Sequence, residues 1–285
     1  MNSYVLITAA HNEEHYIEGL IKSVTVQTLK PRRWVIVSDG STDSTADIIT
    51  RYARQFSFIH PIITPPQQER SFSSKAMAVN TAYQHLACLE FDAVGILDAD
   101  VTFEQNYYEQ LLPHFDINPE LGIIGGFVLD IIDGKTVRRP ISINWSVRGP
   151  VQTFRRECFE AIGGYRALKY GGIDAVAETS ARKAGWRVQT ISDIHAMHHR
   201  ATGTETQSFT RAHFRVGKQN FVNGYDFLFM LLRCLKRLPK KPLIIGSSAM
   251  LAGYISSWIK QEPLEVPPDI VKYLRSEQRH RIFNS

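Results

Sequence analysis

Two aspartates at the end of an apolar run are the first residues in this chain that could carry chemistry. Asp98 and Asp100 directly follow residues 93–97 (AVGIL), a run typical of a buried parallel strand. Alternate residues of an extended chain point the same way, so both carboxylates can face one point. Paired oxygen ligands suit Mg²⁺ or Mn²⁺, which often hold a diphosphate at the same time. A polar turn after a strand remains the alternative interpretation of so short a motif.

A second acidic loop follows another apolar run. Residues 34–37 (WVIV) lead into SDGSTD at 38–43, which contains Asp39. Carboxyl ends of parallel strands meet at one edge of a sheet, where ligands of such sheets bind. A carboxylate there can accept an N–H from a nucleobase edge. The alternative is an Asx turn with a helix cap supplied by Asp43 or Ser44.

The elements that must position these loops alternate along the first 125 residues. Short apolar runs predict strands and amphipathic stretches predict helices between them, which is the pattern of an α/β sheet. From about residue 129 the pattern is weaker, with helices predicted at 155–162 and 174–184. The predicted strands are 4–9, 34–37, 58–64, 93–97 and 121–128, and the predicted helices include 17–24, 75–89, 155–162 and 174–184.

The order and spacing of several segments resemble family-2 glycosyltransferases of the GT-A fold. The resemblance covers residues 3–220. It implies an α/β, Rossmann-like and mostly parallel sheet flanked by helices. The segments that carry it are ITAAHNEE (7–14), VSDGSTD (37–43), KAMAVN (75–80), LDAD (97–100), FRR (154–156), GGY (163–165), Asp174 and GW (185–186).

That resemblance implies an inverting transfer of a sugar from a nucleoside-diphosphate sugar, with a UDP-sugar as the first expectation. By position, Thr8, Ala9 and Glu13 would line the nucleoside pocket, and Asp39 would bind the base. Such transfers pass through a transition state like that of glycoside hydrolysis.

The same resemblance assigns the metal and the base. Asp98 and Asp100 would hold Mn²⁺ or Mg²⁺, which offsets charge on the departing diphosphate. Asp174 would take the proton of the acceptor hydroxyl. Because Asp174 begins a predicted helix, a helix cap is the alternative role.

Basic residues supply further donor-site candidates. His198, in HAMHHR at 195–200, stands where many relatives carry a third metal ligand, and Arg200 could hold a phosphate bidentately. Lys75 and Arg70 are additional phosphate candidates. A structural histidine and solvated cations are the alternatives. A zinc site is not expected, because no cysteine lies nearby.

Three positions depart from the family pattern. Ser38 replaces a common aspartate, Ile173 stands where glutamate is expected before Asp174, and residues 206–216 lack the Gln-x-x-Arg-Trp motif of processive synthases. The missing motif favours the addition of a single sugar rather than the extrusion of a polymer. The basic C-terminal segment points to a lipid-linked glycan or polysaccharide precursor as the acceptor. A sugar nucleotidyltransferase and a catalytically inactive sugar-nucleotide-binding scaffold are the alternatives.

The charge of the chain is concentrated near its C-terminus. Residues 200–241 carry nine lysines and arginines against two acidic residues, a net +7, whereas the whole chain is +5. Residues 227–238 predict a basic amphipathic helix that would lie on an anionic membrane. Residues 242–259 are uncharged and could dip into the bilayer, span it, or pack as a core helix or dimer contact.

Composition bounds the remaining classes. The 44% hydrophobic and 21% charged residues exclude a disordered chain, a collagen and a coiled coil. Three cysteines without CxxC spacing and no predicted signal peptide favour the cytoplasm, peripheral to the inner face of the cell membrane. No binding motif supports nucleic acid as a partner. The expected organisation is a catalytic domain at 1–220, divided near residue 128, and a helical extension at 221–285.

Overall fold

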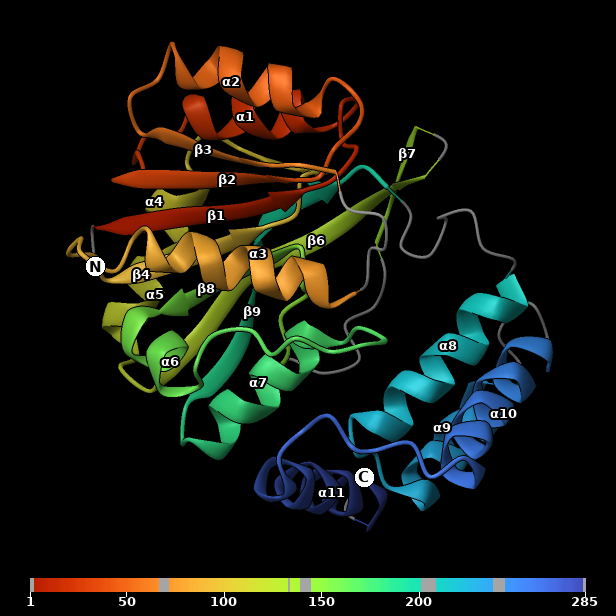
Figure 1. Ribbon diagram of the computed structural model, residues 1–285. Helices are drawn as coiled ribbons and strands as arrows, with labels where there is room; N and C mark the ends of the chain where they lie inside the picture. Colours follow the sequence, from red (N-terminus) through yellow and green to blue (C-terminus); the bar gives the residue numbers. More distant parts are fainter. Residues whose placement is uncertain are drawn as a thin grey trace.

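The computed structural model describes residues 3–66, 72–132, 134–138, 145–200, 209–237 and 244–283. Most of the strands form one sheet at the centre, and most helices of the first 200 residues cover its two faces (Figure 1). The strands are β1 (Tyr4–Ala10), β2 (Arg33–Asp39), β3 (Ile59–Thr64), β4 (Ala93–Leu97), β5 (Val101–Phe103), β6 (Leu121–Ile132), β7 (Lys135–Val137), β8 (Val151–Arg155) and β9 (Arg187–His198). The helices are α1 (Ile17–Thr25), α2 (Thr45–Ala53), α3 (Ser73–Gln84), α4 (Tyr107–Leu111), α5 (Pro113–Ile117), α6 (Arg156–Ala161), α7 (Ile173–Lys183), α8 (Phe209–Val222), α9 (Phe227–Arg237), α10 (Ile245–Ile259) and α11 (Pro268–Phe283).

The strand order is β3-β2-β1-β4-β8-β6-β9-β5, with β7 paired to β6. The strands β3, β2, β1 and β4 run parallel, so their carboxyl ends share one edge. In register, Ala10 of β1 lies beside Ser38 of β2, and Thr8 lies beside Leu97 of β4. The loops that follow these three strands therefore leave the sheet together.

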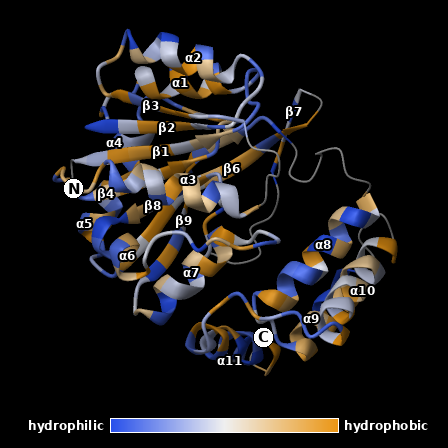
Figure 2. Ribbon diagram, in the orientation of Figure 1, coloured by the Kyte–Doolittle hydropathy of each residue, from blue (hydrophilic) through white to orange (hydrophobic). Residues whose placement is uncertain are grey.

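The central strands are buried on both faces, which explains their continuous apolar runs. Figure 2 shows these strands as mostly hydrophobic and the surrounding helices as alternating in hydropathy along their length. Helices α3, α6 and α7 lie on one face of the sheet in Figure 1. Helix α1 illustrates how a helix packs on the core: its apolar residues Ile17, Leu20, Ile21 and Val24 recur at helical spacing and are buried.

The structure confirms the GT-A-like α/β fold and shows that the sheet is mixed. Half of its strand pairings are antiparallel, and they involve β5, β7 and β8, which the sequence pattern did not predict. Strand β8 lies between β4 and β6 and is antiparallel to both, so it joins the parallel part of the sheet to the mixed part.

The C-terminal helices have a small core of their own, formed by Met230, Cys234, Met250 and Tyr254. Helices α8 and α10 cross closely through glycines: a Cβ on Gly217 would lie 1.9 Å from the Met250 carbonyl oxygen. One side of α10 is therefore a packed helix face, as one of the alternatives for residues 242–259 expected. No helix within the described ranges is long and apolar enough to cross a membrane.

The expected boundaries at residues 128 and 220 stay predictions. Residue 128 falls within β6, and α8 extends across residue 220. The C-terminal helices also contact α7 at both of its ends. Asn223, directly after α8, donates to the carbonyl of Gly171, just before α7 (3.2 Å), and Arg182 of α7 binds Glu277 of α11 (2.8 Å).

Candidate active site

The loops after β1 and β2 are bound to each other at the carboxyl edge of the sheet. Asn12, in a left-handed conformation (φ 53°), accepts a hydrogen bond from the Thr42 N–H (2.9 Å). The Glu13 N–H donates to Thr45 Oγ1 (2.7 Å). His11 Nδ1 contacts the Asp39 carbonyl oxygen (2.7 Å). These contacts hold Glu13 and Asp39 on one rigid rim.

Asp98 lies just beyond β4, and its carboxylate binds the ammonium group of Lys75. Its N–H donates to the Pro150 carbonyl (3.1 Å), and its Oδ1 accepts from Lys75 of α3. Burial lowers the pKa of Lys75, but the carboxylates of Asp98, Asp174 and Asp100 raise that pKa by more, so it lies above its ordinary value. Lys75 is thus a fixed ammonium among three carboxylates.

Asp100 lies two residues further on, between a histidine and an arginine. Its Oδ1 lies 3.4 Å from His198 Nε2, and its Oδ2 lies 3.6 Å from Arg200 Nε. Arg200 also binds Glu13. Burial raises the pKa of Asp100, but His198 and Arg200 lower this pKa by more, so it lies below its ordinary value and the carboxyl group stays ionised. Residues that follow β1 and β4 therefore meet the end of β9 at one point.

Glu13, the remaining carboxyl group of this cluster, has a raised pKa. Burial raises the pKa of Glu13 to about 7, against the opposing effect of Arg200 and with help from the charges of Asp100 and Asp98. Its carboxyl group can therefore change protonation state near neutral pH.

Asp100 and His198 are suitable donors for a divalent ion. Among the described residues, none donates a hydrogen bond to the buried Asp100 Oδ1, which lies near the His198 ring. Within the part of the chain that the structure describes, no three His, Cys, Asp or Glu side chains form a metal cluster. A carboxylate with an imidazole fits Mn²⁺ or Mg²⁺ if a diphosphate and water complete the coordination shell. The third predicted ligand, Asp98, faces Lys75 instead.

Asp174 lies in the first turn of α7 and does not cap it. The N-cap is Gly172, in a left-handed conformation (φ 82°), and α7 has no side-chain cap hydrogen bond. The alternative role of Asp174 as a helix cap is therefore wrong. Gly149 packs directly against the carboxylate: a Cβ there would lie 2.7 Å from Asp174 Oδ2. Ile173, which stands where the family pattern has glutamate, is buried in the main core.

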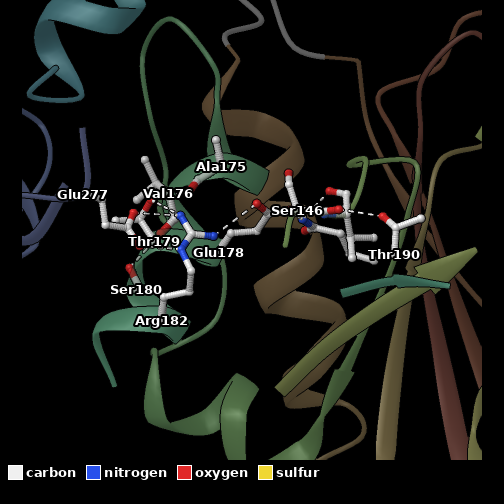
Figure 3. A network of polar contacts seen from close by, with 11 residues as sticks. Ser146, Ala175, Val176, Glu178, Thr179, Ser180, Arg182, Thr190 and Glu277 are labelled. Atoms are coloured by element: carbon white, nitrogen blue, oxygen red, sulfur yellow. Dashed lines mark hydrogen bonds and ion pairs between the residues drawn. The ribbon is translucent and has the colours of Figure 1, made fainter. Parts of the chain in front are cut away.

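The segment 146–150 links the strand β9, the helix α7 and the loop after β4. The Ser146 carbonyl accepts from Thr190, and the Val147 N–H donates to Glu178 Oε1 (2.7 Å), as Figure 3 shows for the surrounding network. Gly149 abuts Asp174, and Pro150 accepts from the Asp98 N–H. This segment therefore fixes the distance between Asp98 and the helix that carries Asp174.

The remaining predicted donor residues are placed as follows. Thr8 is fully buried in β1, and its hydroxyl accepts from the Trp34 indole (3.1 Å), so its side chain is used in the core. Ala9 and Asp39 are half-buried near the rim. Arg70 lies outside the described residues. A nucleoside role for Thr8, Ala9 and Asp39 stays a prediction.

Two buried carboxylates of this region were missed by the sequence reasoning. Asp130 at the end of β6 is fully buried and contacts His198 Nδ1 (3.0 Å) and Arg148 Nη2 (3.0 Å). Glu178 of α7 is also buried, and burial raises its pKa to about 7. Each lies in an apolar or helical pattern whose partners are distant in sequence, so no local signal marks them.

Known proteins with similar sequences are glycosyltransferases. The family model described as "Glycosyl transferase family 2" matches residues 5–173. A poly-beta-1,6-N-acetyl-D-glucosamine synthase of Staphylococcus aureus (strain COL) is 28% identical over 126 residues, 44% of this chain and 28% of that protein. An uncharacterised glycosyltransferase of Nostoc sp. (strain PCC 7120) is 28% identical over 172 residues, 56% of this chain and 48% of that protein. The chain thus matches less than half the length of these relatives.

Solved structures share the fold at low sequence identity. A mannosyltransferase from Pyrobaculum calidifontis, in complex with GDP-Man and Mn²⁺, has a TM-score of 0.58 at 17% identity and covers 99% of this chain and 87% of its own. S. aureus TarS 1–349 in complex with UDP-GlcNAc has a TM-score of 0.56 at 14% identity, covering 98% and 81%. The matched family model spans more than half of the chain, and we conclude that the chain belongs to glycosyl transferase family 2.

Proposed function

We propose that this chain is an inverting glycosyltransferase that moves one sugar from a nucleoside-diphosphate sugar to a hydroxyl of a lipid-linked glycan or polysaccharide precursor. The observation that carries the proposal is the meeting of Asp98, Asp100, Lys75 and Arg200 at the carboxyl edge of the sheet, with Asp174 near enough to raise the pKa of Lys75. Paired cations and carboxylates at that edge suit a diphosphate held with a divalent ion.

The two fixed cations bind the donor diphosphate in this proposal. Arg200, which contacts Asp100, can present its guanidinium to phosphate oxygens, and Lys75, which binds Asp98, adds a second positive charge. A divalent ion between Asp100 and His198 would add charge stabilisation for the departing diphosphate. The named structural relatives bind GDP-Man with Mn²⁺ and UDP-GlcNAc, which supports the donor class.

Asp174 acts as the general base. It takes the proton of the acceptor hydroxyl as that oxygen forms a bond to the anomeric carbon. The bond from this carbon to the diphosphate oxygen breaks on the opposite side, and the diphosphate leaves with the electron pair. The configuration at the anomeric carbon is thereby inverted. Gly149 and α7 hold the carboxylate in place for this step.

The Asp174→Asn variant tests the assignment. Asparagine keeps the shape but cannot take the proton, so sugar transfer is expected to fall by at least 100-fold while the donor Kd changes less than threefold. Donor affinity is measured by calorimetry and transfer by nucleoside diphosphate release. An Asn variant with full activity would remove Asp174 as the base. Pyrophosphate release from a sugar phosphate and a nucleoside triphosphate would support a nucleotidyltransferase instead.

We further propose that α9 binds an anionic membrane surface that carries the acceptor. Its inner face packs Met230 and Cys234, and its outer face exposes several leucines. The exposed leucines of that face are Leu228, Leu232 and Leu235, and Arg233, Lys236 and Arg237 lie on the same helix. Apolar residues combined with basic ones are typical of helices that lie in an anionic leaflet.

Vesicle binding tests the membrane surface. Leu235→Glu should weaken co-sedimentation with vesicles of phosphatidylglycerol and phosphatidylcholine at least tenfold, since it places a carboxylate in the apolar face. Ile117→Glu is the matched control, because Ile117 is an exposed apolar residue of α5 in the sheet domain. Equal binding of the two variants would remove α9 as the membrane contact.

A further inference from the structure

A buried carboxylate behind the candidate metal ligand is used by no step proposed so far. Asp130 is fully buried near the end of β6, and its Oδ1 lies 3.0 Å from His198 Nδ1 and 3.0 Å from Arg148 Nη2. A buried ionised carboxylate is expensive to keep unless it has partners and a role. Its position on the far side of the His198 ring from Asp100 suggests that role.

The strand register brings these residues together. Asp130 and His198 are paired residues on the parallel strands β6 and β9. His198 is thus held with Nδ1 toward Asp130 and Nε2 toward Asp100, at 3.0 and 3.4 Å. Because a carboxylate only accepts hydrogen bonds, Asp130 requires a proton on Nδ1. A divalent ion would take the place of the second ring proton, so the lone pair that binds it is on Nε2, on the side of Asp100.

We propose that Asp130 is a positioning residue: it fixes the ring and the Nδ1–H tautomer of His198, so that Nε2 and Asp100 together bind the divalent ion. This inference rests on the metal-dependent part of the proposed function. A carboxylate that accepts from the second ring nitrogen of a ligating histidine sets its tautomer and raises its basicity. Removal of such a partner typically weakens metal binding about 10- to 100-fold.

Arg148 links this pair to the base side of the site. Its guanidinium donates to Asp130 Oδ1 and to the Val128 carbonyl (3.3 Å). The next residue, Gly149, packs against Asp174. One buried carboxylate therefore contacts both the histidine and the segment that locates the candidate base.

The test measures Mn²⁺ affinity by electron paramagnetic resonance of the free ion, with and without UDP or GDP. Asp130→Leu, which is similar in size but has no acceptor, should raise the Mn²⁺ Kd at least tenfold. Asp130→Asn keeps an oxygen toward both donors and should recover most of the affinity. Asp193→Asn, at an exposed carboxylate of β9, should leave the Kd unchanged.

A double-mutant cycle separates positioning from general damage. If Asp130 acts through His198, Asp130→Leu should weaken Mn²⁺ binding less than twofold when His198 is already alanine. An equal loss in both backgrounds would overturn the proposal. So would wild-type protein that binds no Mn²⁺ under any of these conditions, whatever its turnover.

The wild-type protein provides a second measurement in case the leucine variant does not fold. Nitrogen chemical shifts of the His198 ring, recorded with Mg²⁺ and UDP, should show a protonated Nδ1 and an unprotonated Nε2. A proton on Nε2 would contradict the proposal. Neither measurement needs catalysis, so an enzyme without turnover would refute the proposed function and leave this inference standing.

Discussion

The contact between Gly149 and Asp174 gives a sharp test of how the candidate base is positioned. A Cβ on Gly149 would lie 2.7 Å from Asp174 Oδ2 and 3.2 Å from its Cβ and Cγ. Ordinary contact begins near 3.4 Å, so in Gly149→Ala the carboxylate must retreat by about 0.7 Å. The φ angle of Gly149 is not in the left-handed region, so alanine adds a clash without backbone strain.

The size of the effect follows from that displacement. A misplacement of about 1 Å can lower a rate about 100-fold, because proton transfer needs close alignment. We therefore expect kcat to fall about 10- to 100-fold in Gly149→Ala. The donor Kd should change less than threefold, since the carboxylate is assigned to the acceptor side.

The assay follows nucleoside diphosphate release, with water in place of the acceptor if none is supplied. Gly19→Ala is the matched control: it makes the same substitution in α1, where the added Cβ meets Thr102 at 3.6 Å, an ordinary contact. A Gly149→Ala enzyme with kcat within twofold of this control would refute the reasoning, because the base would then tolerate displacement.

Three further predictions concern stability. The pKa of Glu178 is about 7 in the folded protein against an ordinary 4.5, so the folded state is stabilised below pH 4.5 and loses that stabilisation as the pH rises to 7. Relative to Glu178→Gln, the wild type should lose about 3 kcal/mol of unfolding free energy between pH 4.5 and 8, measured by urea denaturation. Gly217→Ala should lower the unfolding free energy by about 2 kcal/mol or more, because its Cβ would meet the Met250 carbonyl at 1.9 Å; an unchanged melting temperature would contradict this packing. Glu277→Gln should cost about 1–2 kcal/mol by weakening the two hydrogen bonds from Arg182 (2.8 and 3.2 Å), and no loss in urea denaturation would show that the pair does not hold α11 to α7.

The first half of the fold was predictable from sequence because its signals are local. The strands predicted at 4–9, 34–37 and 93–97 lie within or coincide with β1, β2 and β4, since buried parallel strands carry continuous apolar runs. The predicted helix at 174–184 corresponds to α7 within one residue at each end. Acidic loops at the ends of those strands had to meet once the strands were parallel, which is why Asp39, Asp98 and Asp100 could be placed on one edge.

The second half was less predictable because its order comes from tertiary contacts. Strands β8 and β9 were missed: β8 is short, and β9 pairs with β6 through a register shift near residue 126. Asp130 lies inside an apolar run, between Leu129 and Ile131, and only the pairing of β6 with β9 reveals its contact with His198. The sequence also could not show that the carboxylate of Asp98, a predicted metal ligand, faces Lys75, because Lys75 lies on a helix 23 residues earlier.

Donor turnover tests the central claim most directly. The purified protein would be incubated with UDP-, GDP- and dTDP-sugars plus Mn²⁺, with and without EDTA, and the released nucleoside diphosphate measured. We expect release from one of these donor classes, suppressed by EDTA and lost in Asp174→Asn. No release from any donor, or release that EDTA leaves unchanged, would contradict a metal-dependent sugar transfer at the Asp98, Asp100 and Lys75 edge of the sheet.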